Sequence, residues 1–401
     1  MGIFWPPTNP GYATVMKRSD DRILTTHIGS LPRGPALTEL LLAEDRGEAV
    51  DKGEFQRAID AAMTVVVEAQ IAAGVDIGGD GEIPRVSFST YVVQRMSGFG
   101  GESARPIFQD AARFPKWREW INTHMLRRAR LFDAPAAIGP VAYQDFSRAD
   151  QECDAFDRAL AAHDAPFVET FITAASPGIV ATTMENKHYD SHEAYLFALA
   201  AELAKEYQLI IARGYLLQID APDVAMERAC FFQNDDLKTF LDFVEMHVAA
   251  INAALVTIPR DKVRFHACYG NRNSPHAFDV ECPDILPLLY AVEAGALSLP
   301  FANPRHAHEI DAFRDHPLPD HMVLIPGVID TVTNYVEHPA LIAERLERAV
   351  AAVGDRERVI AGTDCGFSTL AGDGFVAEDV VWAKLEALRQ GADLASQRLW
   401  H

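Results

Sequence analysis

Basic charge is scarce in this sequence of 401 residues. There are 36 Lys and Arg residues against 57 Asp and Glu residues, which gives a formal net charge of −21 at pH 7. The sequence also has no run of Lys or Arg that would hold a phosphate backbone or an anionic membrane surface. Nucleic acid and membranes are therefore excluded as expected partners.

Long apolar runs and closely paired cysteines are missing as well. The longest apolar region, residues 286–302, is interrupted by Glu293, whereas a membrane span needs roughly 18 uninterrupted apolar residues. The first residues contain no apolar stretch as long as that of a signal peptide. The 5 cysteines are widely scattered and do not resemble a disulfide scaffold. We therefore expect a cytoplasmic protein whose thiols stay reduced and available for metal binding or chemistry.

The composition itself is that of a globular chain. Apolar residues make up 49% of the sequence and charged residues 23%, which is enough apolar material for a sizeable core. No internal repeat or low-complexity linker divides the chain. We expect one domain over residues 1–401, with its core at residues 22–390.

Short apolar runs rich in β-branched residues alternate with stretches of helical periodicity. Strands are predicted at residues 23–30, 76–82, 170–175, 215–220, 263–269, 296–300, 322–330 and 358–363, and helices at residues 51–73, 192–213, 236–257 and 339–353. Eight strands alternating with helices predict a parallel sheet closed into a (β/α)8 TIM barrel. The long segment 90–165 is expected to be an insertion with helices and a hairpin near residues 135–143.

Polar clusters follow several of the predicted strands. They are THIGS (26–30), GDGE (79–82), QID (218–220), HACYGN (266–271) and GTDCG (362–366). In a TIM barrel the carboxyl ends of the strands form the active-site face, so these clusters are expected to meet in one mouth.

Two of these clusters contain potential metal ligands. His266 and Cys268 lie two positions apart on a predicted strand, so their side chains share a face, and Cys365 follows the last predicted strand. One imidazole and two thiolates suit Zn²⁺, and three protein ligands with one open position is the arrangement of catalytic zinc. A thiol bound to zinc is a thiolate at neutral pH and can attack an alkyl carbon. From spacing alone, a core histidine with two packed cysteines is the alternative.

Six motifs along the chain carry a resemblance to a known family. They are TTHIGSLPR (25–33), DGEIPR (80–85), YLLQIDAP (215–222), HACYGN (266–271), GVIDTVTNYVEHP (327–339) and GTDCGF (362–367). In this order the motifs resemble the cobalamin-independent methionine synthase family, and most closely its short, single-barrel members. The resemblance runs from about residue 24 to residue 374. It implies a single TIM barrel of the superfamily that contains uroporphyrinogen decarboxylase and methionine synthase.

The resemblance also implies an activity and a site. It implies that zinc is held by His266, Cys268 and Cys365, and that the acceptor thiol amino acid is contacted by Ser30, Glu82 and Asp220. Of these, Glu82 and Asp220 are the catalytic candidates, since carboxylates pair with an ammonium. The implied enzyme is a zinc-dependent S-methyltransferase or alkyltransferase that activates a small thiol as a zinc thiolate. Its reaction is of the 5-methyltetrahydropteroyltriglutamate–homocysteine methyltransferase type, which belongs to methionine biosynthesis.

The sequence departs from the family pattern at three positions. The family has a further zinc-ligating Glu after the sixth strand, where this chain has Pro300, so water, substrate or a neighbour such as Glu82 must fill the fourth position. Val332 stands where the full-length enzyme has a His that is thought to act as general acid, and Ala221 replaces a second acid. The proton donor and the alkyl donor are therefore left open.

Two alternative functions stay open. The related epoxyalkane:coenzyme M transferases open an epoxide with a zinc-bound thiolate, and their sulfonate thiol calls for cationic groups. Arg33, Arg85, Arg272 and Arg305 adjoin the strand-end motifs. They either supply those groups, with Arg33 and Arg85 as substrate-binding candidates, or pair with the excess carboxylates. The superfamily also contains metal-free uroporphyrinogen decarboxylase-like proteins, which makes a lyase or a binding protein the other alternative.

The segment after the sixth predicted strand supplies further candidates. Asn303 and His306 are expected to line the mouth, and Asn303 is a substrate-binding candidate. His306 is either an acid or base near pH 7 or a solvated loop residue. Asp364 is a candidate for orienting His266. The expected partners are a small thiol and an alkyl donor, and a homo-oligomer is left open.

Overall fold

The computed structural model describes residues 16–124 and 134–401 of the chain. Within these residues, parallel strands form one sheet in the order β1-β4-β5-β6-β7-β8-β9. The strands are β1 (Ile77–Gly79), β4 (Glu169–Ala175), β5 (Leu216–Asp220), β6 (Val263–His266), β7 (Ala296–Pro300), β8 (Val323–Ile329) and β9 (Gly362–Thr363). Each of them overlaps a predicted strand.

The first predicted strand, residues 23–30, forms only two bridges, but these bridges close the sheet. Thr25 bridges in parallel to Ala361, just before β9, and Thr26 bridges in parallel to Ile77 at the start of β1. The pairing ends there because the chain turns at Gly29, whose φ of 120° lies outside the strand region. The ring of parallel segments confirms the predicted TIM barrel.

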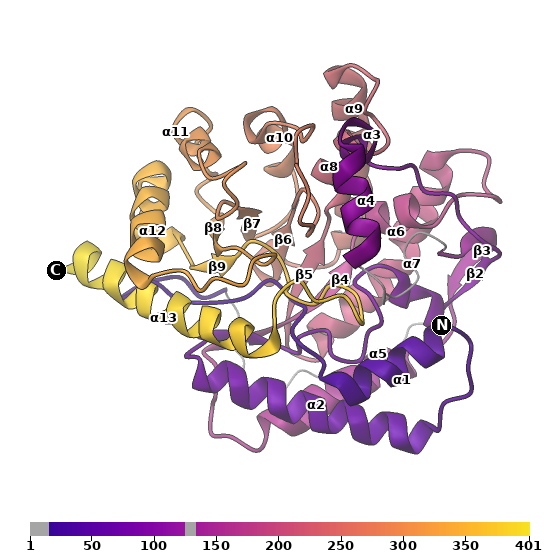
Figure 1. The fold of residues 1–401 in the computed structure, drawn as a ribbon, viewed down its shortest axis with the longest axis horizontal. Coiled ribbons are helices and arrows are strands. Elements are labelled where there is room, and N and C mark those ends of the chain that lie inside the picture. The colour runs from indigo at the N-terminus through magenta and orange to yellow at the C-terminus, as the bar shows by residue number, and fades with distance from the viewer. Residues whose placement is uncertain (1–15, 125–133) are drawn as a thin grey trace.

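Helices cover the outside of this barrel (Figure 1). The larger ones are α2 (Lys52–Ala72), α5 (Ser147–Leu160), α7 (His192–Ala212), α9 (Leu237–Leu255), α10 (Cys282–Leu289), α12 (Pro339–Val353) and α13 (Glu378–Trp400). Helix α2 contacts α5 and α13, α7 contacts α5 and α9, and α12 contacts α13. In α12 the predicted apolar face is observed, because Ile342 and Leu346 are fully buried while Val350 and Val353 pack against the core.

Shorter helices lie between these elements. They are α1 (Pro35–Asp45), α6 (Pro177–Thr183), α8 (Asp223–Met226) and α11 (Ala312–Asp315). Inside the barrel, the Arg264 guanidinium lies 3.9 Å from the centre of the Phe171 ring. It also donates hydrogen bonds to Thr26 Oγ1 and to the His27 carbonyl. This packing fills the barrel interior beneath the carboxyl ends of the strands.

The predicted insertion, residues 90–165, contains elements that are not part of the parallel sheet, together with one of the helices that cover the barrel. It contains strand β2 (Met96–Gly100), helices α3 (Gln109–Arg113) and α4 (Pro115–His124), strand β3 (Ala136–Tyr143) and helix α5, while residues 125–133 lie outside the described residues. Strand β3 pairs antiparallel with β2. The prediction of a hairpin near residues 135–143 was therefore wrong about the partner strand, because β3 runs through this range as one strand and pairs with β2. The partner of β3 precedes α3 and α4, and sequence patterning does not indicate so distant a partner.

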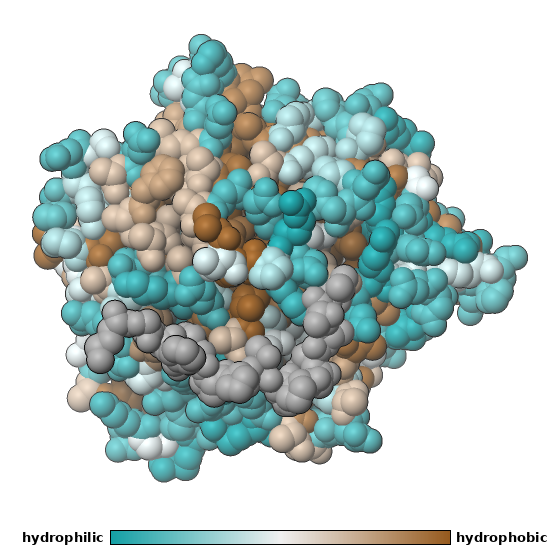
Figure 2. Space-filling model, turned by 180° about the vertical axis from the view of Figure 1, so that it is seen from behind, coloured by the Kyte–Doolittle hydropathy of each residue, from teal (hydrophilic) through white to brown (hydrophobic). Residues whose placement is uncertain are grey.

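The outer surface is mixed in character. On the face seen in Figure 2, hydrophilic residues surround smaller hydrophobic patches. Among the described residues, no helix is both long enough and apolar enough to cross a membrane.

Candidate active site

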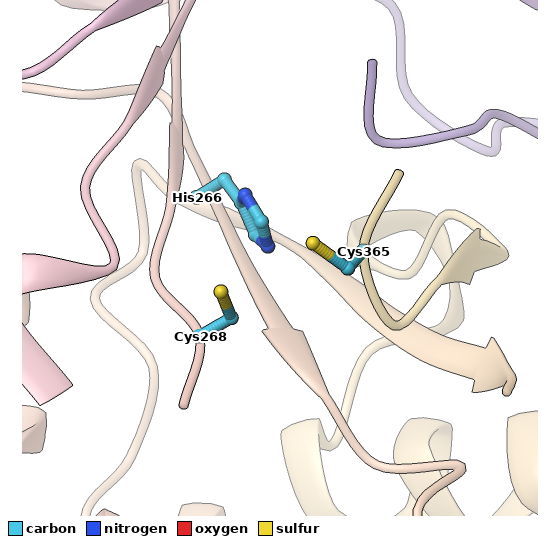
Figure 3. Close-up of side chains that lie close together, drawn as sticks. All are labelled: His266, Cys268 and Cys365. Carbon is cyan, nitrogen blue, oxygen red and sulfur yellow. The ribbon is translucent and has the colours of Figure 1, made fainter. Parts of the chain in front are cut away.

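Three potential metal ligands meet at the carboxyl ends of β6 and β9. His266 is the last residue of β6, Cys268 lies two residues beyond it, and Cys365 lies two residues beyond β9. Figure 3 shows the imidazole ring and the two sulfur atoms pointing toward the space between them. Their ligand atoms all lie within 4.8 Å of one another. The structure therefore brings together the three residues that the sequence singled out as a metal site.

The His266 ring is oriented by the neighbouring strand. Asp220 on β5 stands opposite His266 in the register of the sheet, and its Oδ1 accepts a hydrogen bond from His266 Nδ1 at 3.1 Å. The same oxygen accepts a hydrogen bond from Gln218 Nε2 at 3.0 Å. The other ring nitrogen, Nε2, is buried and has no hydrogen-bond partner among the described residues. A carboxylate on one nitrogen and a free second nitrogen is the arrangement of a metal-ligating histidine, so the residues fit a metal ion.

Without a metal, the charges of the Cys268 thiolate and the His266 imidazolium balance each other, and a bound metal ion would take the place of the proton on His266. A hydrogen bond from Cys365, with the nearby positive charge of His266, holds the pKa of the Cys268 thiol well below its usual range despite burial. Burial opposes a charge on His266, but the Cys268 thiolate and the Asp220 carboxylate outweigh it and raise the pKa of His266 to about 10. An anionic sulfur therefore faces a second sulfur and an imidazole, and this soft donor set is typical of zinc sites.

A cavity of about 310 Å³ opens onto these ligands. Ser30, Glu82 and Asp220 line it together with the three potential ligands. Like His266 Nε2, the Ser30 hydroxyl and Glu82 Oε2 are buried and lack a hydrogen-bond partner within the described part of the chain. Buried polar atoms are costly when unpaired. The cavity therefore offers several polar atoms that a bound molecule would satisfy.

Glu82 sits in a strained turn. Its φ of 54° lies in the left-handed region, which residues other than glycine rarely adopt. Arg33 Nη2 donates a hydrogen bond to the Glu82 carbonyl at 3.2 Å, and Asp80 Oδ1 accepts one from the Glu82 N–H at 3.2 Å. Arg33 is not on the lining of the cavity, so its position is that of a residue that holds this turn. Burial, followed by repulsion from Asp220, raises the pKa of Glu82 to about 7.

Two glycines permit the close packing around Ser30 and Glu82. A Cβ atom on Gly366 would lie 2.1 Å from Ser30 Oγ, and one on Gly29 would lie 2.5 Å from Glu82 Oε1. Asn271 Nδ2 donates a hydrogen bond to the Gly366 carbonyl at 2.8 Å. The segment after Cys365 is thereby held against both Ser30 and the segment after β6.

The outer part of the cavity is apolar and was not anticipated from the sequence. Its apolar wall consists of Ile107, Phe108, Ala111, Trp117 and Ile121, which come from α3, α4 and the residues just before them. Trp117 Nε1 donates a hydrogen bond to the Asn273 carbonyl at 3.0 Å, which attaches α4 to the segment after β6. In a sequence, such residues in an insertion cannot be distinguished from core residues.

Of the four arginines that adjoin the strand-end motifs, Arg272 lines the cavity. Its guanidinium lies 3.3 Å from the centre of the Phe108 ring. Arg272 Nε and Nη1 are buried and have no partner among the described residues. Arg105 also lines the cavity, but its Nη2 is paired with both carboxylate oxygens of Glu227, at 2.7 and 2.9 Å. Arg272 is therefore a buried cation of the cavity lining that can receive an anionic group of a ligand.

A substrate-binding role requires an arginine on the lining of the cavity, and neither Arg85 nor Arg305 lies there. Arg85 lies off the cavity lining, and its Nε donates a hydrogen bond to Glu152 Oε1 at 2.7 Å. Arg305 Nε donates to the His276 carbonyl at 2.9 Å, and Nη2 lies 3.5 Å from Glu281. Both arginines follow the alternative interpretation, in which they pair with carboxylates and carbonyls.

The segment after β7 borders a second, smaller cavity. This cavity of about 30 Å³ is lined by Pro300, Asn303 and Val332, and also by Cys268 and Cys365. Asn303 thus lies beside the ligand group rather than on the lining of the larger cavity. Neither Pro300 nor Val332 has a side-chain atom that ligates a metal or transfers a proton.

The structure does not support the prediction that Asp364 orients His266. Asp364 Oδ1 accepts hydrogen bonds from the N–H groups of Phe301 and Ala302, and Oδ2 accepts one from that of Asn303. These N–H groups follow the end of β7 and attract the carboxylate to that loop. The orienting role falls to Asp220 instead.

The fold and these residues define a class of protein: a TIM barrel with a buried His-Cys-Cys group at the carboxyl ends of its strands. Residues 130–383 match the family model described as cobalamin-independent synthase, catalytic domain, and the chain belongs to this family.

Known relatives extend the likeness over most of the chain. A methionine synthase of Thermococcus kodakarensis is 26% identical over 379 residues, which cover 94% of each protein. One of Sulfurisphaera tokodaii is 24% identical over 348 residues, which cover 86% of each.

Solved structures share the fold. A B12-independent methionine synthase from Shewanella sp. W3-18-1, solved in complex with selenomethionine, superposes with a TM-score of 0.69 at 20% identity. The superposition covers 94% of this chain and 99% of that protein. One from Listeria monocytogenes, described as putative, superposes with a TM-score of 0.61 at 17% identity. At these identities the likeness shows a common fold alone.

Proposed function

We propose that this protein is a zinc-dependent transferase that alkylates the sulfur of a thiol amino acid, most simply by methyl transfer to homocysteine. The observation that carries the proposal is that several unpaired polar atoms belong to the lining of one cavity. His266 Nε2, the Ser30 hydroxyl and Glu82 Oε2 are all buried, all lack a partner among the described residues, and all belong to residues that line one cavity. The names of the relatives from Thermococcus and Sulfurisphaera support the same reaction.

His266, Cys268 and Cys365 would hold the zinc ion. When bound there, zinc lowers the pKa of a coordinated thiol, so that the substrate sulfur is a nucleophile at neutral pH. Asp220 keeps the His266 ring in the tautomer whose Nε2 is free to bind a metal, because Nδ1 carries the proton donated to the carboxylate. Pro300 leaves the fourth position open, which is what an exchangeable substrate requires.

The carboxylates of the cavity favour an amino acid as the thiol. Glu82 and Asp220 present two buried acids to the same space, and an ammonium group would offset their repulsion. The Ser30 hydroxyl and the Arg272 guanidinium can then receive the carboxylate of the same amino acid. The ammonium and the carboxylate of such an amino acid share one carbon, so these groups would hold one end of the molecule and direct the sulfur at its other end to the ligand group.

The apolar wall shapes the site of the alkyl donor. Trp117 and Phe108 offer flat apolar surfaces, which suit the stacking of a ring or the burial of an alkyl chain. A donor that fills the space beside this wall would leave less room for water near its electrophilic alkyl carbon. Val332 supplies no proton, so a donor whose leaving group needs no protonation at this position fits best.

An epoxide-opening transferase is the second candidate, and Arg272 is the observation that favours it. Its Nε and Nη1 are buried without a partner among the described residues and would pair with a sulfonate thiol. The two acids Glu82 and Asp220 favour the amino acid thiol over the sulfonate.

A paired assay distinguishes the two candidates. The zinc-loaded protein is incubated with L-homocysteine and methylated pterin, corrinoid or small methylated donors, and in parallel with coenzyme M and epoxypropane. Mass spectrometry should detect methionine in the first series, and a Cys365→Ser variant should form none. Formation of the coenzyme M thioether alone would establish the second candidate, and no product with any pair would contradict both.

A further inference from the structure

A second group of ligating side chains lies outside the candidate active site. His276, Asp279 and His306 are all buried, and one ligand atom from each lies within 4.8 Å of the others. His276 and Asp279 belong to the segment after β6, and His306 belongs to the segment after β7. No step of the proposed reaction uses any of them.

The two histidines point one nitrogen each at the same carboxylate oxygen. His276 Nδ1 lies 2.7 Å and His306 Nε2 lies 3.0 Å from Asp279 Oδ2. The other carboxylate oxygen, Asp279 Oδ1, is buried and has no hydrogen-bond partner among the described residues. An unpaired carboxylate oxygen in the interior is unusual, and it leaves one position at which a metal ion could bind.

The opposite nitrogen of each ring is already fixed. His276 Nε2 donates a hydrogen bond to the Arg272 carbonyl at 3.1 Å, and His306 Nδ1 donates one to Glu309 Oε2 at 2.7 Å. Metal-ligating histidines almost always have their second nitrogen bonded in this way to a carbonyl or a carboxylate. Glu309 is itself held, because its Oε1 accepts the N–H of Cys282 at 2.8 Å.

The backbone is strained at the same place. His276 has a φ of 51°, in the region that non-glycine residues rarely adopt. Its N–H donates a hydrogen bond to Asp110 Oδ2 at 3.1 Å, which ties the turn to α3. Strain of this kind is retained where the surroundings impose a particular side-chain direction.

We propose that His276, Asp279 and His306 bind a second divalent metal ion, which fastens the segment after β6 to the segment after β7. At a bond length of about 2.1 Å, ligands at right angles lie roughly 3.0 Å apart, whereas tetrahedral ligands lie roughly 3.4 Å apart. The observed separations of 2.7 and 3.0 Å therefore fit a six-coordinate ion. Two histidines and one carboxylate are a donor set used by first-row divalent metals such as Mn²⁺, Fe²⁺ and Co²⁺.

Such an ion would steady the ligands of the first site. The Tyr269 ring, which directly follows Cys268, stacks on His306 with 3.7 Å between ring centres. The small cavity of about 30 Å³ is lined by His276 and His306 as well as by Cys268 and Cys365. It has room for about one water molecule, which would be one further ligand of the second ion.

Cobalt substitution of the full-length protein tests this proposal. The metal-free protein is titrated with Co²⁺ while bound metal is counted by mass spectrometry and visible absorption is recorded. We expect two equivalents to bind, one with the intense sulfur-to-cobalt charge-transfer band and one without it. Saturation at one equivalent that carries the charge-transfer band would overturn the second site, and this result needs no variant.

Variants assign the two equivalents. His306→Gln should keep one equivalent together with the charge-transfer band, whereas Cys365→Ser should keep one equivalent without the band. His321→Gln is the matched control, since His321 is exposed and belongs to neither group, and it should keep both. Two equivalents in His306→Gln would contradict the assignment. A parent protein that binds only the His306-dependent equivalent, without the band, would instead contradict the first site.

Discussion

Asp220 and His266 face each other across β5 and β6, and the Asp220 carboxylate accepts a hydrogen bond from His266 Nδ1 at 3.1 Å. This one hydrogen bond decides which ring nitrogen is left to bind a metal. It also connects the two parts of the cavity, because Asp220 lines the same space as the potential substrate-binding acid Glu82.

The first prediction concerns this pair. Asp220→Asn keeps the shape of the side chain but removes the charge that holds His266 in position. We expect the zinc affinity, measured by competition with a chromophoric chelator, to fall roughly 10- to 100-fold. Asp379→Asn is the control, since Asp379 is exposed at the start of α13. Equal affinities in the parent and Asp220→Asn would show that the hydrogen bond is not used in metal binding.

The second prediction concerns the ionisation of Glu82. Burial and the nearby Asp220 raise the pKa of Glu82 to about 7, and only the ionised carboxylate binds an ammonium group. The kcat/KM for the thiol should therefore fall as the pH drops below about 7. Glu82→Gln should lower kcat/KM at pH 8 roughly 10- to 100-fold, the loss of one charged hydrogen bond, and should abolish this acidic limb. If kcat/KM of Glu82→Gln still falls as the pH drops below about 7, another group is responsible for this pH dependence.

The same pKa shift predicts an effect on stability. Because the folded-state pKa is raised from 4.5 to about 7, the folded protein retains a proton that the unfolded chain has released, and stability declines as the pH rises through this window. Glu82→Gln should therefore melt at a higher temperature than the parent at pH 8, and the difference should shrink at pH 5. If Glu82→Gln melts at a lower temperature than the parent at pH 8, the ionised Glu82 carboxylate does not destabilise the fold.

The third prediction concerns Arg272. Arg272 Nη2 donates a hydrogen bond to the Tyr269 carbonyl, whereas Nε and Nη1 have no partner among the described residues. Arg272→Gln should raise the KM of the substrate that carries the anionic group about tenfold or more, while kcat changes much less. Arg105→Gln is not a suitable control because Arg105 also lines the cavity. Arg398→Gln, on the exposed part of α13, should leave both constants unchanged. A fall in kcat at constant KM would show that Arg272 acts in the chemical step instead.

The fourth prediction uses Gly366. An added Cβ would lie 2.1 Å from Ser30 Oγ, so Gly366→Ala must displace Ser30 or the segment that carries Cys365. We expect a loss of stability of about 1–3 kcal/mol in denaturant unfolding and a large loss of activity. Gly374→Ala should be nearly neutral, because its Cβ would meet only the Val376 carbonyl, at 3.9 Å. Full activity in Gly366→Ala would place Ser30 outside the substrate site.

Much of the barrel could be predicted because its strands and helices are local patterns. The helix at residues 339–353 coincides with α12, and the predicted strand 296–300 coincides with β7. The convergence of His266, Cys268 and Cys365 followed from a general property of parallel barrels, in which strand ends share one face. Period-two spacing was sufficient to place His266 and Cys268 together.

What could not be predicted depends on partners distant in the sequence. Arg85 is turned away from the cavity by Glu152 on α5, and no pattern near Arg85 indicates this pairing. The apolar wall comes from the insertion, where Phe108 and Trp117 resemble core residues until the fold places them over the barrel mouth. The sequence does not indicate that His276 and Asp279 form a group with His306, because the three residues meet only where the segments after β6 and β7 lie side by side.

Zinc-edge X-ray absorption spectroscopy tests the central claim most directly, since it counts the sulfur atoms bound to the metal. The zinc-loaded protein should show two sulfur ligands at about 2.3 Å and one nitrogen ligand. After addition of L-homocysteine the sulfur count should rise to three, because the substrate thiol enters the open position. An unchanged sulfur count at saturating homocysteine, or a spectrum without sulfur ligands, would contradict thiol activation by a metal at His266, Cys268 and Cys365.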